Sequence, residues 1–510
     1  MKQFEKVPVV KPKTNVFDLS HEKKLSCGIG ELIPIYLQEV LPGDMFKVNT
    51  ELLIRLAPLA FPLQHRVNAF IHYFFVPNRI IWSNWEDFIT GGKDNTNASV
   101  HPYITLSNTN KANFYRGTLA DYLGIPTMDG VTVTQDVQIN ALPFKAYQQI
   151  YNDYYLDPVL DTEVNISAGT DGAQTIANIS PLRTRCWEKD YFTSALPHPQ
   201  QGNASVQLPI EGTIEPDYLN QSVIAAVTTG PVNGDIKSAT GLLQDASSNA
   251  IRIENLENPQ NVDFTGIDIE DLRTAIKLQE WLEKNARGGW RYIEQMLSHF
   301  GVTSKDSRLQ RAEYLGGGKQ PIVISEVIAT ADTGSYDVGQ LAGHGISVGK
   351  SNGFQRYFTE HGWIIGILSV MPRSAYFQGI PRQFRKYDKF DYYWPEFANL
   401  GEQEVLNEEL YYSGTDAIGG TFGYQSRYAE YKFGIDTVHG DYRTTGYENY
   451  HMGRKFSSAP SLNSTFVHVD KAQTDRVFQV TTATIDKLYV QLYNKVKAVR
   501  PIPYFSNPRF

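Results

Sequence analysis

Residues 345–349 (GISVG) match the G-x-S-x-G motif of serine hydrolases. In that motif a strand leads into a sharp turn, which lifts the serine hydroxyl above a sheet. The residues on both sides are rich in glycine, serine and asparagine, so they favour a loop over such a strand. We therefore interpret Ser347 as a chance match rather than a nucleophile.

Residues 316–319 (GGGK) invite comparison with the phosphate-binding P-loop. That motif needs a glycine five residues before its Gly-Lys pair and a serine or threonine directly after the lysine. Glu313 and Gln320 occupy these two positions, so the pattern fails at both. The glycine run predicts a flexible or tightly turned loop instead.

Possible metal ligands and catalytic acids are scattered along the chain. The 11 histidines include no H-E-x-x-H pair, and His65 and His72 are seven residues apart, which places them on opposite faces of a strand. Cys27 and Cys186 are the two cysteines, so we expect neither a disulfide framework nor a cysteine-rich metal site. The carboxylate spacing that glycoside hydrolysis requires cannot be read from a sequence. We expect no catalytic centre and no cofactor.

The composition narrows the class of protein. Of the 510 residues, 41% are hydrophobic and 20% are charged, which supplies a large core and excludes global disorder. The 47 basic residues against 55 acidic ones leave a net charge of −8, which argues against a dedicated duplex-DNA binder. No apolar segment approaches the ~20 residues of a membrane span, and none follows Met1 as in a secretory signal. We expect a protein that is made inside the cell and does not insert into a membrane.

The hydrophobic pattern predicts strands near both ends of the chain and helices between them. In 46–56, apolar residues alternate with Lys47, Asn49, Glu51 and Arg55, the pattern of a half-buried strand. Residues 363–370 are apolar except for Ser369 and predict a strand that is buried on both faces. Further strands are expected at 67–76 and 488–493, and helices at 142–156, 268–286 and 292–300.

The charge is unevenly distributed. Residues 203–265 contain eight acidic and two basic residues, and only Tyr218 and Phe264 are aromatic. A segment with so few large apolar side chains cannot form much of a core, so we predict a surface-exposed acidic insertion. After Asp486, by contrast, the chain has five basic residues and no acidic one.

The basic C-terminal segment 487–510 combines cations, which neutralise phosphates, with aromatic rings, on which bases stack. Single-strand binding uses this combination. The segment is equally consistent with a terminal core strand followed by a solvated tail. A second basic and aromatic segment covers 382–390, and packing at a subunit interface is its favoured alternative. Our candidates for DNA contacts are Lys487, Lys495, Lys497, Arg500, Tyr504, Phe505 and Arg509, and from the second segment Arg382, Arg385 and Lys386.

Short sequence blocks occur in a fixed order over nearly the whole chain. They include 30–35 (GELIPI), 39–46 (EVLPGDMF), 73–79 (YFFVPNR), 190–197 (DYFTSALP), 286–289 (ARGG), 298–302 (SHFGV), 310–318 (QRAEYLGGG), 391–395 (DYYWP) and 423–432 (GYQSRYAEYK). Each block is weak alone. Together they resemble the major capsid proteins of microviruses, small phages with single-stranded DNA, and specifically the gokushovirus-type branch.

This resemblance implies one mainly β domain over 1–510. It would be an eight-stranded antiparallel jelly roll with long loop insertions that contain several helices. Sixty copies would form a T=1 icosahedral shell around circular single-stranded DNA. Residues 203–265 would form a protrusion on the threefold axes that serves in attachment to a host surface receptor.

The resemblance also implies partners and a location. The partners are an internal scaffolding protein during assembly, a small basic DNA-binding protein and a pilot protein. The protein would be assembled in the cytoplasm of a bacterial host and would remain in the virion as a non-enzymatic capsid component. Because subunits at −8 cannot neutralise DNA by their bulk charge, DNA binding then requires a local basic, aromatic inner face or a basic partner.

One alternative function belongs to a different class. A glycan-binding or glycan-cleaving β-sandwich would use the tyrosines to line a sugar groove. It predicts a monomer with a carboxylate-lined cleft, whereas the capsid hypothesis predicts a particle.

Overall fold

The computed structural model describes residues 13–505, except for 93–95, 97, 203–224, 227–251, 254–268, 290, 304, 307–308, 329–340, 351–352, 415–417, 481 and 483. The chain forms two compact units, one of Met1–Pro199 with Gly288–Phe510 and one of Gln200–Arg287. In the second unit, the described elements are α6 (Ile269–Gly288) and the short pair of β8 (Ala225–Ala226) with β9 (Arg252–Ile253). Apart from this pair, the predicted acidic insertion 203–265 lies outside the described residues.

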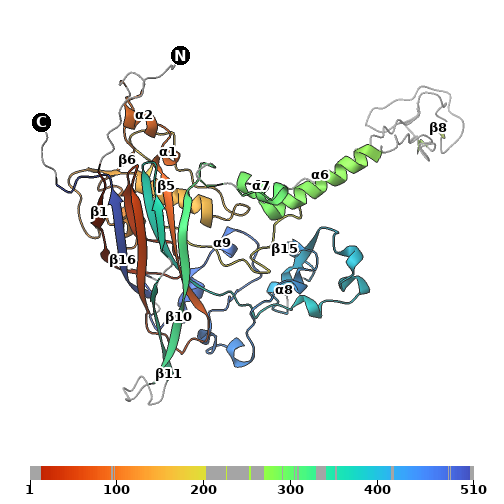
Figure 1. Ribbon diagram of the computed structural model, residues 1–510. Helices are drawn as coiled ribbons and strands as arrows, with labels where there is room; N and C mark the ends of the chain where they lie inside the picture. Colours follow the sequence, from red (N-terminus) through yellow and green to blue (C-terminus); the bar gives the residue numbers. More distant parts are fainter. Residues whose placement is uncertain are drawn as a thin grey trace, which may run out of the picture. The chain divides into compact units, whose positions relative to one another are not determined.

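Eight long strands of the first unit pair in two antiparallel sheets. One sheet has the order β2-β16-β4-β11 and the other β3-β13-β5-β10, and pairing of β10 with β11 joins the two sheets (Figure 1). This is the strand order of a jelly roll, so the predicted mainly β fold is confirmed. The strands are β2 (His21–Cys27), β3 (Ile33–Val40), β4 (Met45–Leu56), β5 (Val67–Pro77), β10 (Glu313–Ile328), β11 (Leu341–Lys350), β13 (Gly362–Pro372) and β16 (Leu488–Arg500).

Shorter elements extend this framework. The strands β1 (Asn15–Asp18) and β12 (Phe354–Tyr357) pair with β16 and β4 at the ends of the first sheet. Two separate pairs are β6 (Tyr103–Leu106) with β7 (Val137–Asn140) and β14 (Glu402–Leu406) with β15 (Thr421–Ser426). The helices of this unit are α1 (Asn78–Ile81), α2 (Trp85–Thr90), α3 (Leu119–Leu123), α4 (Leu142–Ile150), α5 (Ile176–Ile179), α7 (Tyr292–Phe300), α8 (Asn407–Leu410), α9 (Ser464–Val467) and α10 (Lys471–Asp475).

The predicted helices are confirmed with one change. Residues 292–300 form α7, and α6 (Ile269–Gly288) corresponds to the helix predicted at 268–286. The predicted helix at 142–156 is divided, because α4 ends at Ile150 and the turn η2 (Tyr151–Tyr155) continues it with π-helical hydrogen bonding.

The two sheets pack face to face around the main core. In β4 and β16, every second residue is buried, as the alternation of their sequences requires. A buried side chain of leucine size stabilises the fold by about 1.5–3 kcal/mol. The core includes Ile33 and Ile35 of β3, Phe46, Val48 and Ile54 of β4, Ile71 and Tyr73 of β5, Ile364 and Leu368 of β13, and Leu488, Leu492 and Val496 of β16.

The two central strands of the second sheet, β5 and β13, are buried on both faces, whereas most of β10 is exposed or half-buried. On the side away from the main core, Phe74 of β5 and Ile365 of β13 pack with Phe144 and Tyr147 of α4. This packing explains why β13 is apolar except for Ser369. The β2-β16-β4-β11 sheet differs, because in β4 and β16 the residues that point away from the core are exposed or half-buried. One face of the jelly roll is therefore open to other molecules.

The predicted loop at Gly316–Gly318 is wrong, because these glycines lie within β10 and pair with β5. The pairing shifts register between Tyr314 and Gly316. A Cβ atom on Gly317 would lie 2.3 Å from the carbonyl oxygen of Ile71, so only glycine allows the two backbones to approach this closely. Glycine here serves a close strand contact and not a turn.

The loop predicted around Ser347 is also wrong, because residues 341–350 form β11. Ser347 is buried, and its Oγ donates to the carbonyl oxygen of Pro321 at 2.8 Å and accepts a hydrogen bond from Gln320 at 2.5 Å. These two partners fix the hydroxyl inside the sheet, so it has neither the exposure nor the base of a nucleophile.

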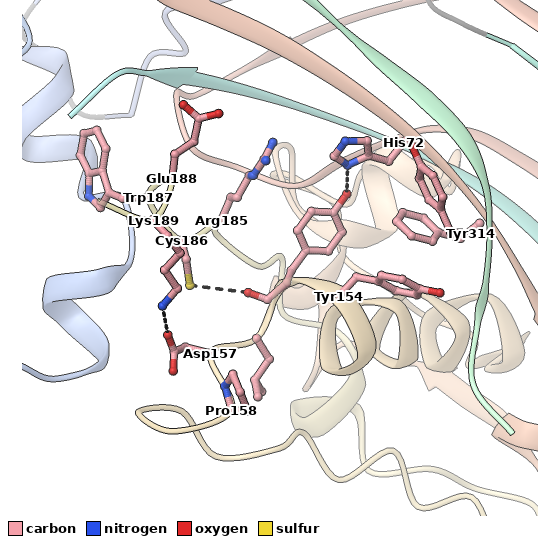
Figure 2. A pocket seen from close by; sticks show the side chains of 13 residues that line it. His72, Tyr154, Asp157, Pro158, Arg185, Cys186, Trp187, Glu188, Lys189 and Tyr314 are labelled. Carbon is pink, nitrogen blue, oxygen red and sulfur yellow. Dashed lines mark hydrogen bonds and ion pairs between the residues drawn. The ribbon is translucent and has the colours of Figure 1, made fainter. Parts of the chain in front are cut away.

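Two histidines make the fold sensitive to acid. His72 Nδ1 lies 2.8 Å from the hydroxyl of Tyr155 (Figure 2), and His65 Nε2 lies 2.6 Å from the carbonyl oxygen of Arg373. Burial lowers the pKa of each histidine from its usual 6.5 to about 4. Between these pH values the unfolded chain binds protons that the folded chain does not, so stability falls as the pH drops from 6.5 to 4.

We expect each histidine to contribute up to about 3 kcal/mol to this loss. In His72→Gln, the unfolding midpoint should therefore fall less steeply with decreasing pH than in the wild type. Thermal unfolding at pH 7, 6, 5 and 4 measures both slopes. Parallel slopes would show that His72 is not the source of the acid sensitivity.

Candidate nucleic-acid interface

The exposed side of the β2-β16-β4-β11 sheet, which we call the outer sheet face, brings together cations from distant parts of the chain. Lys495 and Lys497 point outward from β16. Lys497 pairs in register with Lys47 of β4, and Tyr489 of β16 pairs with Arg55. Because residues that pair directly across two strands point to the same side, these four side chains share one surface with Lys495.

The strand register assigns the remaining residues of this face. Six cations against three carboxylates leave it a net charge of +3, in a chain that carries −8 overall. The cations are Lys24, Lys47, Arg55, Lys350, Lys495 and Lys497, the carboxylates are Asp18, Glu22 and Glu51, and the exposed tyrosines are Tyr357, Tyr489 and Tyr493.

Part of this charge is compensated within the sheet. Lys350 lies 3.0 Å from Glu51, and Lys24 lies 3.6 Å from Glu22. The side-chain and backbone hydrogen bonds from Ser20 hold the pKa of Asp18 below its usual value, and Lys497 and Lys495 add to this effect. Within the part of the chain that the structure describes, Lys47, Arg55, Lys495 and Lys497 form no ion pair.

On the β1 side Lys497 lies opposite Asp18, but on the β4 side it lies opposite another cation. Lys47 and Lys497 lie directly opposite each other, and like charges at such a pair are destabilising. Lys495 and Lys497 lie about 7 Å apart along β16 on the same side. A chain of phosphates laid along this face would relieve the repulsion, and the neighbouring tyrosines offer ring surfaces to its bases.

The fold and this face can be compared with known proteins. The chain matches the family described as "Capsid protein (F protein)" over residues 5–510. The chain belongs to this capsid-protein family. It is 34% identical to capsid protein VP1 of Bdellovibrio phage phiMH2K and 31% identical to that of Chlamydia phage 1, in both cases over 99% of this chain and 97% of the relative. It is also 31% identical to capsid protein VP1 of Spiroplasma virus 4, over 96% of this chain and 94% of that protein. The predicted resemblance and the capsid function are confirmed.

Most of the C-terminal segment of this capsid protein is a strand and not a tail. Residues 488–500 form β16, which lies between β2 and β4. Lys487, just before it, is buried, and its ammonium donates to the carbonyl oxygens of Thr482 and Ile485 at 2.8 and 2.6 Å. Lys487 therefore holds a turn and offers no charge to a ligand.

Arg500, at the end of β16, also has a structural partner. Its guanidinium binds the carboxylate of Asp44 through two nitrogens, at 2.9 and 3.2 Å, and Asp44 is completely buried. Tyr504 and Phe505 follow the strand with 65% and 74% of their surfaces exposed. The Tyr504 ring stacks on Phe17 with one face, so its other face and the ring of Phe505 remain available to bases. Arg509 lies outside the described residues.

The second basic segment is neutralised by acids. Arg382 pairs with Glu409 at 2.8 Å, Arg385 with Glu408 at 2.9 Å, and Lys386 with Glu430 at 2.9 Å. The carboxylates of Glu408 and Glu409 are buried. These cations hold their own segment in place, so we do not include them in the interface.

Four cations of the outer sheet face were not predicted from the sequence: Lys24, Lys47, Arg55 and Lys350. The alternation in 46–56 already places Lys47 and Arg55 on the solvent side of a strand. The missing information was the pairing of this strand with β16, more than 430 residues later in the chain, which no local pattern contains. Among the described residues, no helix is long and apolar enough to cross a membrane.

Proposed function

We propose that this protein is the subunit of a T=1 icosahedral shell of sixty copies, and that its outer sheet face contacts the packaged single-stranded DNA. The capsid family supports self-assembly. The observation that supports the DNA contact is the net positive, tyrosine-bearing sheet face that the rest of the described subunit leaves exposed. A purely structural subunit gains nothing from placing Lys47 opposite Lys497.

The proposal includes the remaining partners. An internal scaffolding protein acts during assembly in the cytoplasm of the bacterial host, and the mature subunit resides in the virion with a small basic DNA-binding protein and a pilot protein. The acidic segment 203–265 serves in attachment to a host surface receptor. This segment is net negative, as DNA is, whereas the outer sheet face is net positive. Repulsion from the DNA phosphates supports a position of the segment away from the genome.

The glycan-directed alternative has less support. The family match covers residues 5–510, almost the whole chain, and the named relatives are capsid proteins. The tyrosines that the alternative assigned to a sugar groove are divided among the outer sheet face and other parts of the surface.

We predict that Lys495→Glu with Lys497→Glu lowers the DNA content of particles severalfold while the shells still form. Both lysines are exposed and lack an ion pair in the described chain, so their reversal leaves the subunit core intact. The change moves the outer sheet face from +3 to −1, and repulsion of phosphates then replaces attraction. Particles from cells that express the phage genes are purified, and the DNA per shell is measured by absorbance ratio and by quantitative amplification.

A matched control is Lys284→Glu with Lys305→Glu, which makes the same change in net charge at exposed lysines that are not part of the sheet. We expect its DNA content to equal that of the wild type. Equal DNA content in the Lys495/Lys497 variant would contradict a genome contact at this face and leave the capsid function untouched.

A further inference from the structure

Three possible metal ligands converge on segments that do not belong to the β2-β16-β4-β11 sheet. Cys186 and His468 are partners in an isolated antiparallel bridge. Two backbone hydrogen bonds of 2.8 and 3.1 Å flank this bridge, so Cys186 and His468 form the type of pair whose side chains lie closest. Segments 282 residues apart thus place a thiol beside an imidazole.

Asp161 reaches the same imidazole from a third segment, the turn after η2. One carboxylate oxygen, Oδ2, lies 2.9 Å from His468 Nε2 and also accepts the backbone N–H of Asp157 at 3.1 Å. The other oxygen, Oδ1, accepts a hydrogen bond from the hydroxyl of Ser464. The carboxylate is therefore fixed on both sides and aimed at Nε2.

The three ligand atoms are spaced for one small ion. Cys186 Sγ lies 3.7 Å from His468 Nε2, and all three ligand atoms lie within 4.8 Å of one another. Ligands at Zn–S of ~2.3 Å and Zn–N or Zn–O of ~2.0–2.2 Å around a tetrahedral ion are about 3.3–3.6 Å apart. If Oδ2 and Nε2 moved apart by a few tenths of an ångström, the ion would fit between them.

The surroundings of His468 allow Nε2 to bind a metal while Nδ1 keeps its proton. Nδ1 lies 3.2 Å from the hydroxyl of Thr184, which can accept that proton in a hydrogen bond. Histidine ligands commonly donate the second ring N–H to such a partner, because it fixes the tautomer and the ring orientation. Thr184 and Ser464 thus support the imidazole and the carboxylate from behind.

We propose that Asp161, Cys186 and His468 bind one divalent transition-metal ion of the zinc class. On binding, the thiol proton and any proton on Nε2 pass to solvent, and the thiolate and carboxylate neutralise the ion's two charges. A cavity of about 430 Å³ borders Asp161 and His468 and admits water as a fourth ligand. Cys186 approaches from the neighbouring pocket, where its sulfur lies 3.5 Å from the carbonyl oxygen of Tyr155 (Figure 2).

The ion would tie together three loop segments that no disulfide joins. Both cysteines are free thiols, and Cys27 lies in the core between the sheets. Among the described residues, the cluster of Asp161, Cys186 and His468 is the one group of three such ligands that meets these distances. The site is independent of the proposed DNA contact, so it can be tested without packaging.

The test uses the full-length protein, stripped with a chelator and then supplied with Zn²⁺ or Co²⁺. We expect about one ion per chain by elemental analysis, and for Co²⁺ the charge-transfer absorption of a cobalt–thiolate bond. Zn²⁺ should slow alkylation of Cys186 by iodoacetamide at least tenfold, with the modified residue located by mass spectrometry.

Variants separate this site from adventitious binding. Cys186→Ala should lose the cobalt–thiolate absorption, and Asp161→Asn should weaken metal binding at least tenfold, because each removes one ligand. Cys27→Ala, the matched control, should bind the metal as the wild type does. The proposal would be overturned if the wild-type protein bound no stoichiometric metal, or if the cobalt spectrum of Cys186→Ala were unchanged. The wild-type measurement does not depend on the folding of any variant.

Discussion

Replacing Arg500 by glutamate is expected to destabilise the subunit by about 3–5 kcal/mol, a large share of the ~5–15 kcal/mol by which folded proteins are stable. The guanidinium is the charged partner of Asp44, whose side chain is completely buried. Asp44 also accepts the backbone N–H of Leu41 at 2.8 Å, within the turn that joins β3 to β4. Reversal at Arg500 leaves this carboxylate without its cation and brings a second carboxylate against it.

Urea unfolding of the purified subunit, followed by circular dichroism, measures this loss. The unfolding free energy of Arg500→Lys should lie between those of the wild type and Arg500→Glu, because an ammonium cannot form both hydrogen bonds that the guanidinium donates to Asp44. Lys497→Glu, three residues earlier on the same strand, is the matched control and should unfold within about 0.5 kcal/mol of the wild type, because its side chain is exposed. Equal stability of Arg500→Glu and Lys497→Glu would show that the Asp44 ion pair contributes nothing.

This contrast shows what the sequence could and could not predict about the C-terminal segment. Its cations are visible as letters, and the alternation in 488–493 correctly predicts a strand. Whether a given cation faces solvent or a buried acid depends on distant residues: the partner of Arg500 is Asp44, more than 450 residues earlier. Lys487, Lys497 and Arg500 look alike in the sequence, yet the first holds a turn, the second is exposed and the third neutralises a buried carboxylate.

The same reasoning explains the errors at the glycine-rich segments. Strands β4, β5, β13 and β16 were predictable because burial on one or both faces leaves a period of two or a continuous apolar run. The glycines of β10 and β11 break both patterns. They are required by close contacts, as at Gly345, where a Cβ atom would lie 2.3 Å from the side chain of Leu56. Such a constraint comes from the neighbouring strand, so local propensity predicts a loop.

The aromatic segment, Arg382–Phe397, has large apolar side chains that are exposed. It contains three 3₁₀ turns, η3 (Arg382–Phe384), η4 (Lys389–Asp391) and η5 (Pro395–Phe397). Phe384 is 65% exposed and Tyr387 is 78% exposed. Tyr392, Tyr393 and Trp394 are each about half exposed. An exposed cluster of this kind marks a site of protein contact.

The segment is held rigidly in spite of its exposure. The three ion pairs of Arg382, Arg385 and Lys386 fix its first turn, and the indole of Trp394 donates to the carbonyl oxygen of Lys389 at 2.9 Å. Rings that are already ordered lose little entropy when another surface covers them. In a capsid subunit the partner that every copy meets is another copy, so we assign this segment to an interface between subunits.

Phe384→Ser combined with Tyr387→Ser is therefore expected to reduce the yield of shells at least tenfold while the subunit remains folded. Truncated aromatic residues at the centre of an interface commonly cost 2 kcal/mol or more each, and a tenfold loss of affinity corresponds to about 1.4 kcal/mol. The loss recurs in every copy of a closed shell, so assembly should respond more steeply than a single contact would. Sedimentation and electron microscopy of protein made together with the proposed scaffolding protein measure the shells, and circular dichroism measures the fold.

The outer sheet face supplies the matched control for this variant. Tyr357→Ser combined with Tyr489→Ser also removes two exposed aromatic rings, of 59% and 47% exposure, but from the surface that we assign to the genome. Shells of this control should form at wild-type yield and package less DNA, because base stacking and not subunit contact is lost. Normal shells from the Phe384/Tyr387 variant would place the aromatic segment on the free surface of the particle. Failure of both variants to form shells would mean that the outer sheet face, too, lies between subunits.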